Sequence, residues 1–444
     1  MTKDMTKGAL LPLLIRFTIP LVLGNLLQLT YNAADSIIVG RYVGKDALAA
    51  VGTSNPLMTL IILFVQGICL GAGILIGTLY GAKDYTRLKK QVSTSMMAGL
   101  GFSLAVTAAA VVSAPWLLTL LQVDKDILPQ AASYLRIVMC GLVFNFVYNY
   151  FASVLRAMGD SKSPLLFLGI SAVLNIAGDI FFVAVLRMEV EGCAISTVLC
   201  EALSCLLCMI YIKKKIPLLD MGREWLVFEK SMLKETFQYG MVSALQQSTV
   251  QIGKLGIQGI VNTMGVTATA AFTAINRIDD FAYIPEQNIG HAMTSVMAQN
   301  RGAGENERVR KAFYIGIVVE VLYGLAAGVV LLLLASRLMR LFTTDEETIG
   351  EGVRYLRLIA FMYIIPALTN GVQGYFRGMG DLKITLWSSI INFAVRFVSC
   401  VPLVFVFDMG IMALPWAYLC GWTAMMIYEF PFLFHGGLRA KMRE

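Results

Sequence analysis

Polar side chains recur on one face of the first long apolar segment of the chain. Asn25, Gln28, Asn32 and Asp35 are spaced three, four and three positions apart, so they line one side of a helix. Pro20 precedes them and lacks a backbone hydrogen-bond donor, which predicts a bend in that helix. The stripe ends in a carboxylate, a group that can carry a proton or bind a small hard cation.

A second group of similar chemistry follows later in the chain. Asn175 and Asp179 are one helical turn apart, and Thr197 lies on the next apolar segment. With Asp35 they offer two carboxylates, an amide oxygen and a hydroxyl, an all-oxygen set for a small cation. Two close carboxylates in a dry site also repel each other, which favours binding of a proton. The residue types therefore predict a cation-coupling site and leave H⁺ and Na⁺ open. The simpler alternative is that each acid only bonds a neighbouring helix.

The composition indicates that these residues lie inside a membrane. Of the 444 residues, 57% are hydrophobic and 15% are charged, whereas soluble domains carry about 25% charged residues. Apolar runs such as 57–79, 165–186 and 386–407 are long enough to cross a bilayer as helices. Their continuity excludes the alternating pattern of barrel strands. We therefore expect an all-α polytopic membrane protein.

The chain repeats itself at a fixed distance. "NYFASVLRAMGDSK" and "NGVQGYFRGMGDLK" are 221 positions apart, as are "YGAKDYTRLKK" and "RGAGENERVRK". Later the spacing between matching positions changes to 217. Asn175 then corresponds to Asn392, and Asp179 corresponds to Arg396. We expect "MGD" to end a helix, with its Arg at the membrane interface, Gly in the turn and Asp as a cap.

The repeats predict two six-helix halves, 1–212 and 234–444, joined by a cytoplasmic linker, 213–233. Because each half has an even number of spans, it enters and leaves the membrane on the same side. The halves are therefore expected to be parallel repeats around a central cavity. The twelve transmembrane helices are expected at about 11–40, 47–79, 92–121, 127–155, 164–187, 192–212, 234–263, 268–300, 312–335, 348–377, 384–407 and 411–434.

The distribution of Lys and Arg predicts the orientation. They gather in the loops on the side that holds both termini, and the opposite loops hold few. Both termini are therefore expected in the cytoplasm, with the chain in the plasma membrane. The net charge of +7 follows from this asymmetry and calls for no nucleic-acid partner. The eight cysteines lie in apolar segments, so we expect no metal or redox cofactor. No obligate partner is indicated, and a monomer is expected.

The second half lacks the acidic set of the first. Gly256 matches Asp35, and the seventh segment instead carries Lys254. We expect Lys254 to pair with Asp280 or Asp279, and Arg396 to have a similar acidic partner; structural and gating roles stay open. The residues expected along the substrate cavity, with Glu286 attracting a cationic substrate, are Asn25, Gln28, Asn32, Gln247, Gln251, Asp280 and Glu286.

In combination, these features resemble the multidrug and toxic compound extrusion (MATE) family over essentially the whole chain. The resemblance is carried by "IPLVLGNLLQLTYNAADSIIVGR", "YGAKD" with "NRGAG", and "RAMGD" with "RGMGD". It implies export of amphiphilic organic cations in exchange for inward H⁺ or Na⁺. In related members a first-helix Asp, an Asn-x-x-x-Asp pair and a Thr bind the cation, roles that fall on Asp35, Asn175, Asp179 and Thr197.

One departure concerns the second half. Some family members use acids on helices 7 and 10 as a sodium site, whereas this chain has Gln246, Gln247 and Thr249 on helix 7 and Asn370 on helix 10. Coupling is therefore expected in the first half only.

Other functions remain as alternatives. A flippase of a lipid-linked precursor would need a more basic cavity, to which Lys254, Arg277 and Arg396 would contribute. A passive channel would show no saturation. No Walker A motif and no metal-spaced His cluster occur, which disfavours an ATP-driven pump and an enzyme.

Overall fold

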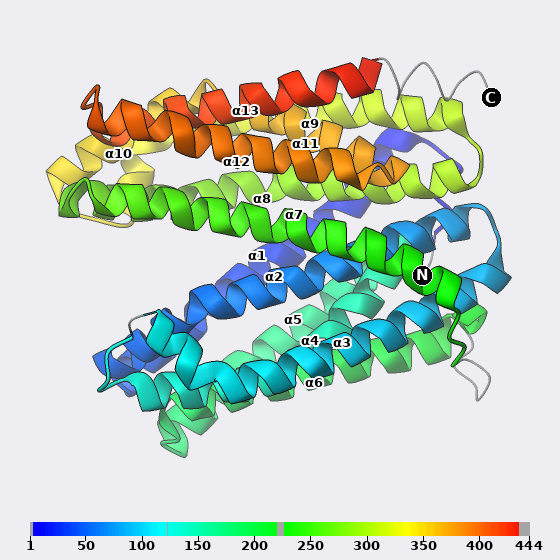
Figure 1. The fold of residues 1–444 in the computed structure, drawn as a ribbon, viewed down its shortest axis with the longest axis horizontal. Coiled ribbons are helices and arrows are strands. Elements are labelled where there is room, and N and C mark those ends of the chain that lie inside the picture. Colours follow the sequence, from blue (N-terminus) through cyan, green and yellow to red (C-terminus); the bar gives the residue numbers. More distant parts are fainter. Residues whose placement is uncertain (1–2, 122, 220–225, 435–444) are drawn as a thin grey trace. The chain divides into compact units, whose positions relative to one another are not determined.

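The computed structural model describes residues 3–121, 123–219 and 226–434, and every regular element in these ranges is a helix (Figure 1). The helices of the first half are α1 (Leu10–Tyr42), α2 (Lys45–Gly81), α3 (Tyr85–Leu120), α4 (Leu128–Ala157), α5 (Lys162–Asp179) and α6 (Glu189–Lys215). Those of the second half are α7 (Lys230–Asn262), α8 (Val266–Gly302), α9 (Asn306–Arg340), α10 (Glu346–Ala360), α11 (Ile364–Met379), α12 (Leu382–Phe405) and α13 (Ala413–Phe432).

These helices confirm the predicted all-α membrane fold. Within the described residues, nine helices are long and apolar enough to cross a membrane, and α10 and α11 together form a tenth span. The helices α7 and α8 are of similar length but carry more polar residues. Together they supply the twelve expected spans in the expected order.

The tenth span differs from the expected continuous helix. Its two parts, α10 and α11, meet at an angle of 54°. Pro366 cannot donate a backbone hydrogen bond to residue 362, which weakens the helix at this point and favours a break. Instead, Met362 N donates to Ile359 O over 2.8 Å and Ile365 N donates to Met362 O over 2.9 Å, which are tighter turns.

The chain forms two compact units. Unit 1 comprises Met1–Asp4 and Ile19–Ala244, and unit 2 comprises Met5–Thr18 and Leu245–Glu444. In unit 1, α4 packs on α2, α3 and α6, and α5 packs on α6. In unit 2, α8 packs on α9 and α11, and α12 runs beside α13 (Figure 1).

The backbone repeats as the sequence does. Residues with left-handed φ occur in pairs 221 positions apart: Gly44 and Gly265, Lys83 and Gly304, Gly159 and Gly380, Arg187 and Asp408, and Glu189 and Gly410. As expected for "MGD", α4 and α11 end directly before this turn, and Gly380 has φ 78° at the end of α11. The duplication therefore extends to the turns that end the helices.

The same pairs correct the alignment of α5 with α12. Arg187 and Asp408 lie beyond these helices and keep the spacing of 221. The shift to 217 read from the sequence is therefore not reproduced in the backbone. The counterpart of Asn175 is Arg396, and that of Asp179 is Cys400.

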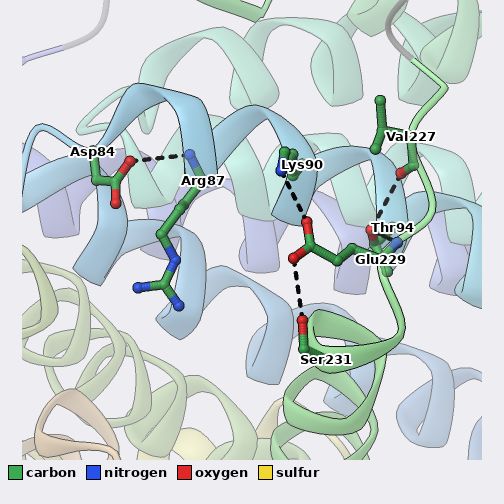
Figure 2. Close-up of polar contacts among 7 residues, drawn as sticks. All are labelled: Asp84, Arg87, Lys90, Thr94, Val227, Glu229 and Ser231. Atoms are coloured by element: carbon green, nitrogen blue, oxygen red, sulfur yellow. Dashed lines mark hydrogen bonds and ion pairs between the residues drawn. The ribbon is translucent and has the colours of Figure 1, made fainter.

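The segment that precedes α7 is bound to α3 (Figure 2). Thr94 Oγ1 donates to the carbonyl of Val227 over 3.2 Å and accepts from Glu229 N over 3.1 Å. Lys90 Nζ lies 3.2 Å from Glu229 Oε2. The end of the connection between the repeats is thus fixed to the surface of unit 1.

Candidate cation-coupling site

Two of the predicted acids meet in unit 1. Side-chain oxygens of Asp35 and Asp179 and the sulfur of Cys193 lie within 4.8 Å of one another. They come from α1, the last residue of α5 and the first part of α6. Asp179 is fully buried and Asp35 is half-buried. Helices distant in sequence therefore place two carboxylates side by side.

The backbone changes its helical form at this site. A π-helix, η1 (Ile180–Val185), begins directly after Asp179. The sequence predicted a single helix over 164–187 and gave no sign of this change. Such wider turns often lie at functional positions. Gly178 also matters, because a Cβ there would lie 2.5 Å from Ser196 Oγ on α6. The glycine thus allows α6 to approach α5 closely.

The neighbouring hydroxyls have different partners. Ser196 Oγ donates to the backbone oxygen of Asn175 over 3.0 Å and accepts from Asn175 Nδ2 over 3.3 Å. The half-buried Thr197 instead donates to the carbonyl of Cys193 over 3.1 Å. Ser196 was not singled out from the sequence, because two adjacent hydroxyls can be told apart only when the rotation of the helix is known.

Several oxygens at this site are buried without a donor. Among the described residues, Oδ1 of Asp35 and Oδ1 of Asn175 accept no hydrogen bond, and Asp179 has only the hydroxyl of Ser196 and the thiol of Cys193 beside it. Two ionised carboxylates this close repel each other, and burial without a counter-charge is costly. The geometry can accommodate a shared proton or a small cation that neutralises this charge.

A third acid extends the polar region. Glu201 on α6 accepts from Asn145 Nδ2 on α4 over 2.7 Å, and its second oxygen has no partner among the described residues. Neither residue was singled out from the sequence. The signal was present, because Glu201 interrupts an apolar span just as Asp179 does.

The polar residues on one face of α1 differ in how far they are buried. Asn25 and Gln28 are half-buried and Asn32 is exposed. Gln28 contacts Tyr31, which in turn interacts electrostatically with Asp35 and Glu201. The helix α1 continues through Pro20 without a break in its secondary structure.

The expected ion pairs of the second half differ from each other. Lys254 Nζ lies 3.4 Å from Asp280 Oδ1, and Asp279 accepts from the hydroxyl of Tyr363. Arg396 meets no carboxylate within 4.0 Å among the described residues, contrary to the expectation from sequence.

Aromatic rings surround Arg396 instead. Its guanidinium carbon lies 4.0 Å from the ring centre of Tyr418, 4.8 Å from Phe393 and 5.6 Å from Trp422. Arg396 also donates to Asn392 Oδ1 over 3.3 Å. Ring faces attract a cation, which accounts for a buried arginine without a carboxylate partner.

The residues expected along the substrate path in the second half divide into two groups. Gln247, Gln251 and Asp280 are half-buried. Glu286 is 0% exposed and therefore lies on no open surface in this structure, contrary to its expected role.

Comparison with known proteins gives a consistent result. The MatE family model matches residues 20–181 and 243–401. A probable multidrug resistance protein of Bacillus subtilis, YpnP, is 30% identical over 395 residues, 88% of each chain. Probable multidrug resistance protein NorM of Thermotoga maritima is 24% identical over 410 residues, 90% of this chain and 87% of that protein.

Solved structures share the fold. An outward-facing multidrug resistance MATE family transporter superposes with a TM-score of 0.93, at 22% identity, over the whole of both chains. A MATE structure in a bent conformation also gives 0.93, covering all of this chain and 99% of that one.

Proposed function

The chain belongs to the MATE family of secondary multidrug transporters, and from this premise we propose that it couples efflux of amphiphilic organic cations to inward movement of H⁺ or Na⁺. The family membership makes the chain a membrane-embedded transporter rather than an enzyme. Beyond the family membership, we propose that transport is coupled to an ion, that the substrate is cationic, and which residues couple ion binding to substrate export.

One observation supports the coupling site above all others. Asp35 and Asp179 lie side by side inside a membrane protein, and no cationic side chain among the described residues is paired with either of them. Ionisable groups in a membrane mark ion paths by default. We assign cation binding to Asp35 and Asp179, with Asn175 and its bound Ser196 orienting the site. Thr197, which the resemblance indicates, lies one position further along α6.

The transport cycle proposed here depends on the charge of this pair. An ion entering from outside reduces the negative charge of the two carboxylates and weakens their attraction for a cationic drug. Helix α1 then rearranges about Pro20, beside which the division between the two units falls. The drug leaves, and the ion is released inward. Linkage requires that ion and drug weaken each other's binding equally, by about 1.4 kcal/mol for each tenfold change.

The membrane, the orientation of the chain and its oligomeric state are part of the same proposal. The protein acts in the plasma membrane with both termini in the cytoplasm, as a monomer with 1–212 and 234–444 as its lobes. It needs no cofactor besides the coupling ion.

The test is ethidium efflux from proteoliposomes that contain the purified protein. A pH gradient and a sodium gradient are imposed separately, and empty liposomes are the control. Efflux that one gradient drives supports the antiporter and identifies its ion. Efflux that proceeds equally without any gradient contradicts coupling and favours a passive path.

A further inference from the structure

A separate set of buried acids lies in unit 2, remote in sequence from the coupling site. Glu286 on α8, Glu320 on α9 and Glu429 on α13 are each 0% exposed. Neither carboxyl oxygen of Glu286 has a hydrogen-bond donor among the described residues, while the backbone of Gly290 lies beside Glu320, and Ser388 and Gln373 lie beside Glu429. Three acids on three helices thus share an environment in which an ionised carboxylate is poorly stabilised.

Close helix packing encloses these acids. A Cβ at Gly374 would lie 2.7 Å from the backbone oxygen of Gly290, so α8 and α11 approach each other through glycines. A Cβ at Gly371 on α11 would lie 3.5 Å from Cγ of Glu320 on α9. Glu286 is one turn before Gly290. Glu286 and Glu320 therefore lie on two helices that both pack against α11.

One cation accompanies the three acids. Arg377 on α11 is 3% exposed and interacts electrostatically with Glu320 and Glu429. The sequence predicted an arginine at the membrane interface, but its Nε donates to the backbone oxygen of Gln373 over 3.3 Å within the protein. One guanidinium can balance one of three carboxylates.

The other charged groups nearby are already engaged. Lys254 pairs with Asp280, Asp279 bonds Tyr363, and Arg396 lies among aromatic rings. Titratable or charged groups that interact with the three acids from the surrounding helices are Asp279, Tyr283, Tyr323, Tyr363, Arg377 and Tyr428.

We propose that Glu286, Glu320 and Glu429 form a proton-binding site, in which Arg377 balances one carboxylate and protons neutralise the other two. A polar network provides it with hydrogen-bonding groups, because Ser388 and Gln373 lie beside Glu429 and Gln373 accepts from Gln246 Nε2 over 3.1 Å. The site is independent of the coupling role assigned to Asp35 and Asp179, and it adds proton binding to a half in which sequence alone predicted none.

The first test uses dicyclohexylcarbodiimide, which modifies protonated carboxyl groups in apolar surroundings. The purified protein is treated at several pH values, and modified peptides are identified by mass spectrometry. We expect adducts on the buried glutamates that decrease as pH rises, and none on the exposed Glu347. Labelling that sodium blocks, but pH leaves unchanged, would overturn the assignment in favour of a metal ion.

Infrared difference spectra provide a second measurement that needs no reagent access. A C=O band of protonated carboxylic acid should lose intensity with rising pH in the wild type, and should be weaker in Glu286→Gln, Glu320→Gln and Glu429→Gln. The Asp35→Asn variant should keep the labelling of these glutamates, which separates this proposal from the coupling site. Absence of both the adducts and the glutamate-dependent band in folded wild-type protein would overturn it.

Discussion

Asn175 and Arg396 occupy equivalent positions in the two repeats, and their surroundings have opposite chemical character. Asn175 bonds Ser196 near two carboxylates, whereas Arg396 lies against the ring of Tyr418 at 4.0 Å. By the spacing of 221, Tyr418 and Trp422 are the counterparts of Thr197 and Glu201. The second repeat thus carries a permanent cation at the position where the first has groups that can bind one.

The aromatic surroundings of Arg396 should contribute measurable stability. Cation–π contacts are worth about 0.5–2 kcal/mol, more when they are buried. In a double-mutant cycle of Arg396→Met and Tyr418→Leu, we expect a coupling energy of about 1 kcal/mol, measured from unfolding in mild detergent. The exposed pair of Arg310 and Tyr314, at 5.9 Å, is the control and should show less. Equal coupling in both pairs would contradict the interpretation.

The two hydroxyls of α6 should differ in their effect on coupling. Ser196→Ala removes a donor to Asn175 and should weaken apparent affinity for the coupling ion several-fold, since a hydrogen bond contributes about 0.5–1.5 kcal/mol. Thr197→Ala removes a bond within α6 only and should have a smaller effect. The measurement is efflux rate against ion concentration. A larger effect of Thr197→Ala would favour the role that the family resemblance gives to Thr197.

Gly71 should be required for packing in unit 1. A Cβ at this position would lie 2.5 Å from the backbone of Tyr239. Gly71→Ala should therefore cost about 1–3 kcal/mol through overpacking, seen as a lower melting temperature. Gly52 lies on the same helix with nothing within 4 Å of the added atom, so Gly52→Ala is the matched control. A similar loss in both variants would contradict the role of this contact, because Ala has a higher helix propensity than Gly and should stabilise an uncrowded position.

Asp160, in the turn after α4, should make the stability of the fold depend on pH. Burial acts to raise the pKa of Asp160, but its hydrogen bonds, which include those from Ser163 and Tyr211, together outweigh burial and hold that pKa below its ordinary value. A carboxyl with a lowered pKa stabilises the fold above its unfolded pKa of about 4. This contribution is lost as the pH falls through the folded pKa.

Asp160→Asn should therefore lower the melting temperature at pH 7, and its difference from the wild type should shrink in acid. The effect at pH 7 should be on the order of 1 kcal/mol, as for a lost helix cap. The exposed Asp46→Asn is the control. A difference that is constant across pH would contradict the assigned role of the charge.

Sequence patterns were sufficient for much of the fold. Apolar length located the spans, and the repeated "MGD" located the left-handed turns at Gly159 and Gly380. The break between α10 and α11 was missed, because three residues separate the parts and only Pro366 marks it.

The candidate site was predicted less completely. Spacing brought Asp35 and Asp179 into consideration, but the π-helix after Asp179 depends on tertiary packing and leaves no local signal. Glu320 and Glu429 were visible as acids in apolar runs and were overlooked. The structure was needed to show that they are buried with Arg377.

The most direct test compares wild type with Asp35→Asn in gradient-driven ethidium efflux, with ethidium binding measured on the same preparations. We expect Asp35→Asn to bind ethidium, because the fold is intact, but to export it no faster than empty liposomes. Binding should also lose its competition with the coupling ion. Undiminished efflux in Asp35→Asn would contradict the assignment of coupling to Asp35 and Asp179.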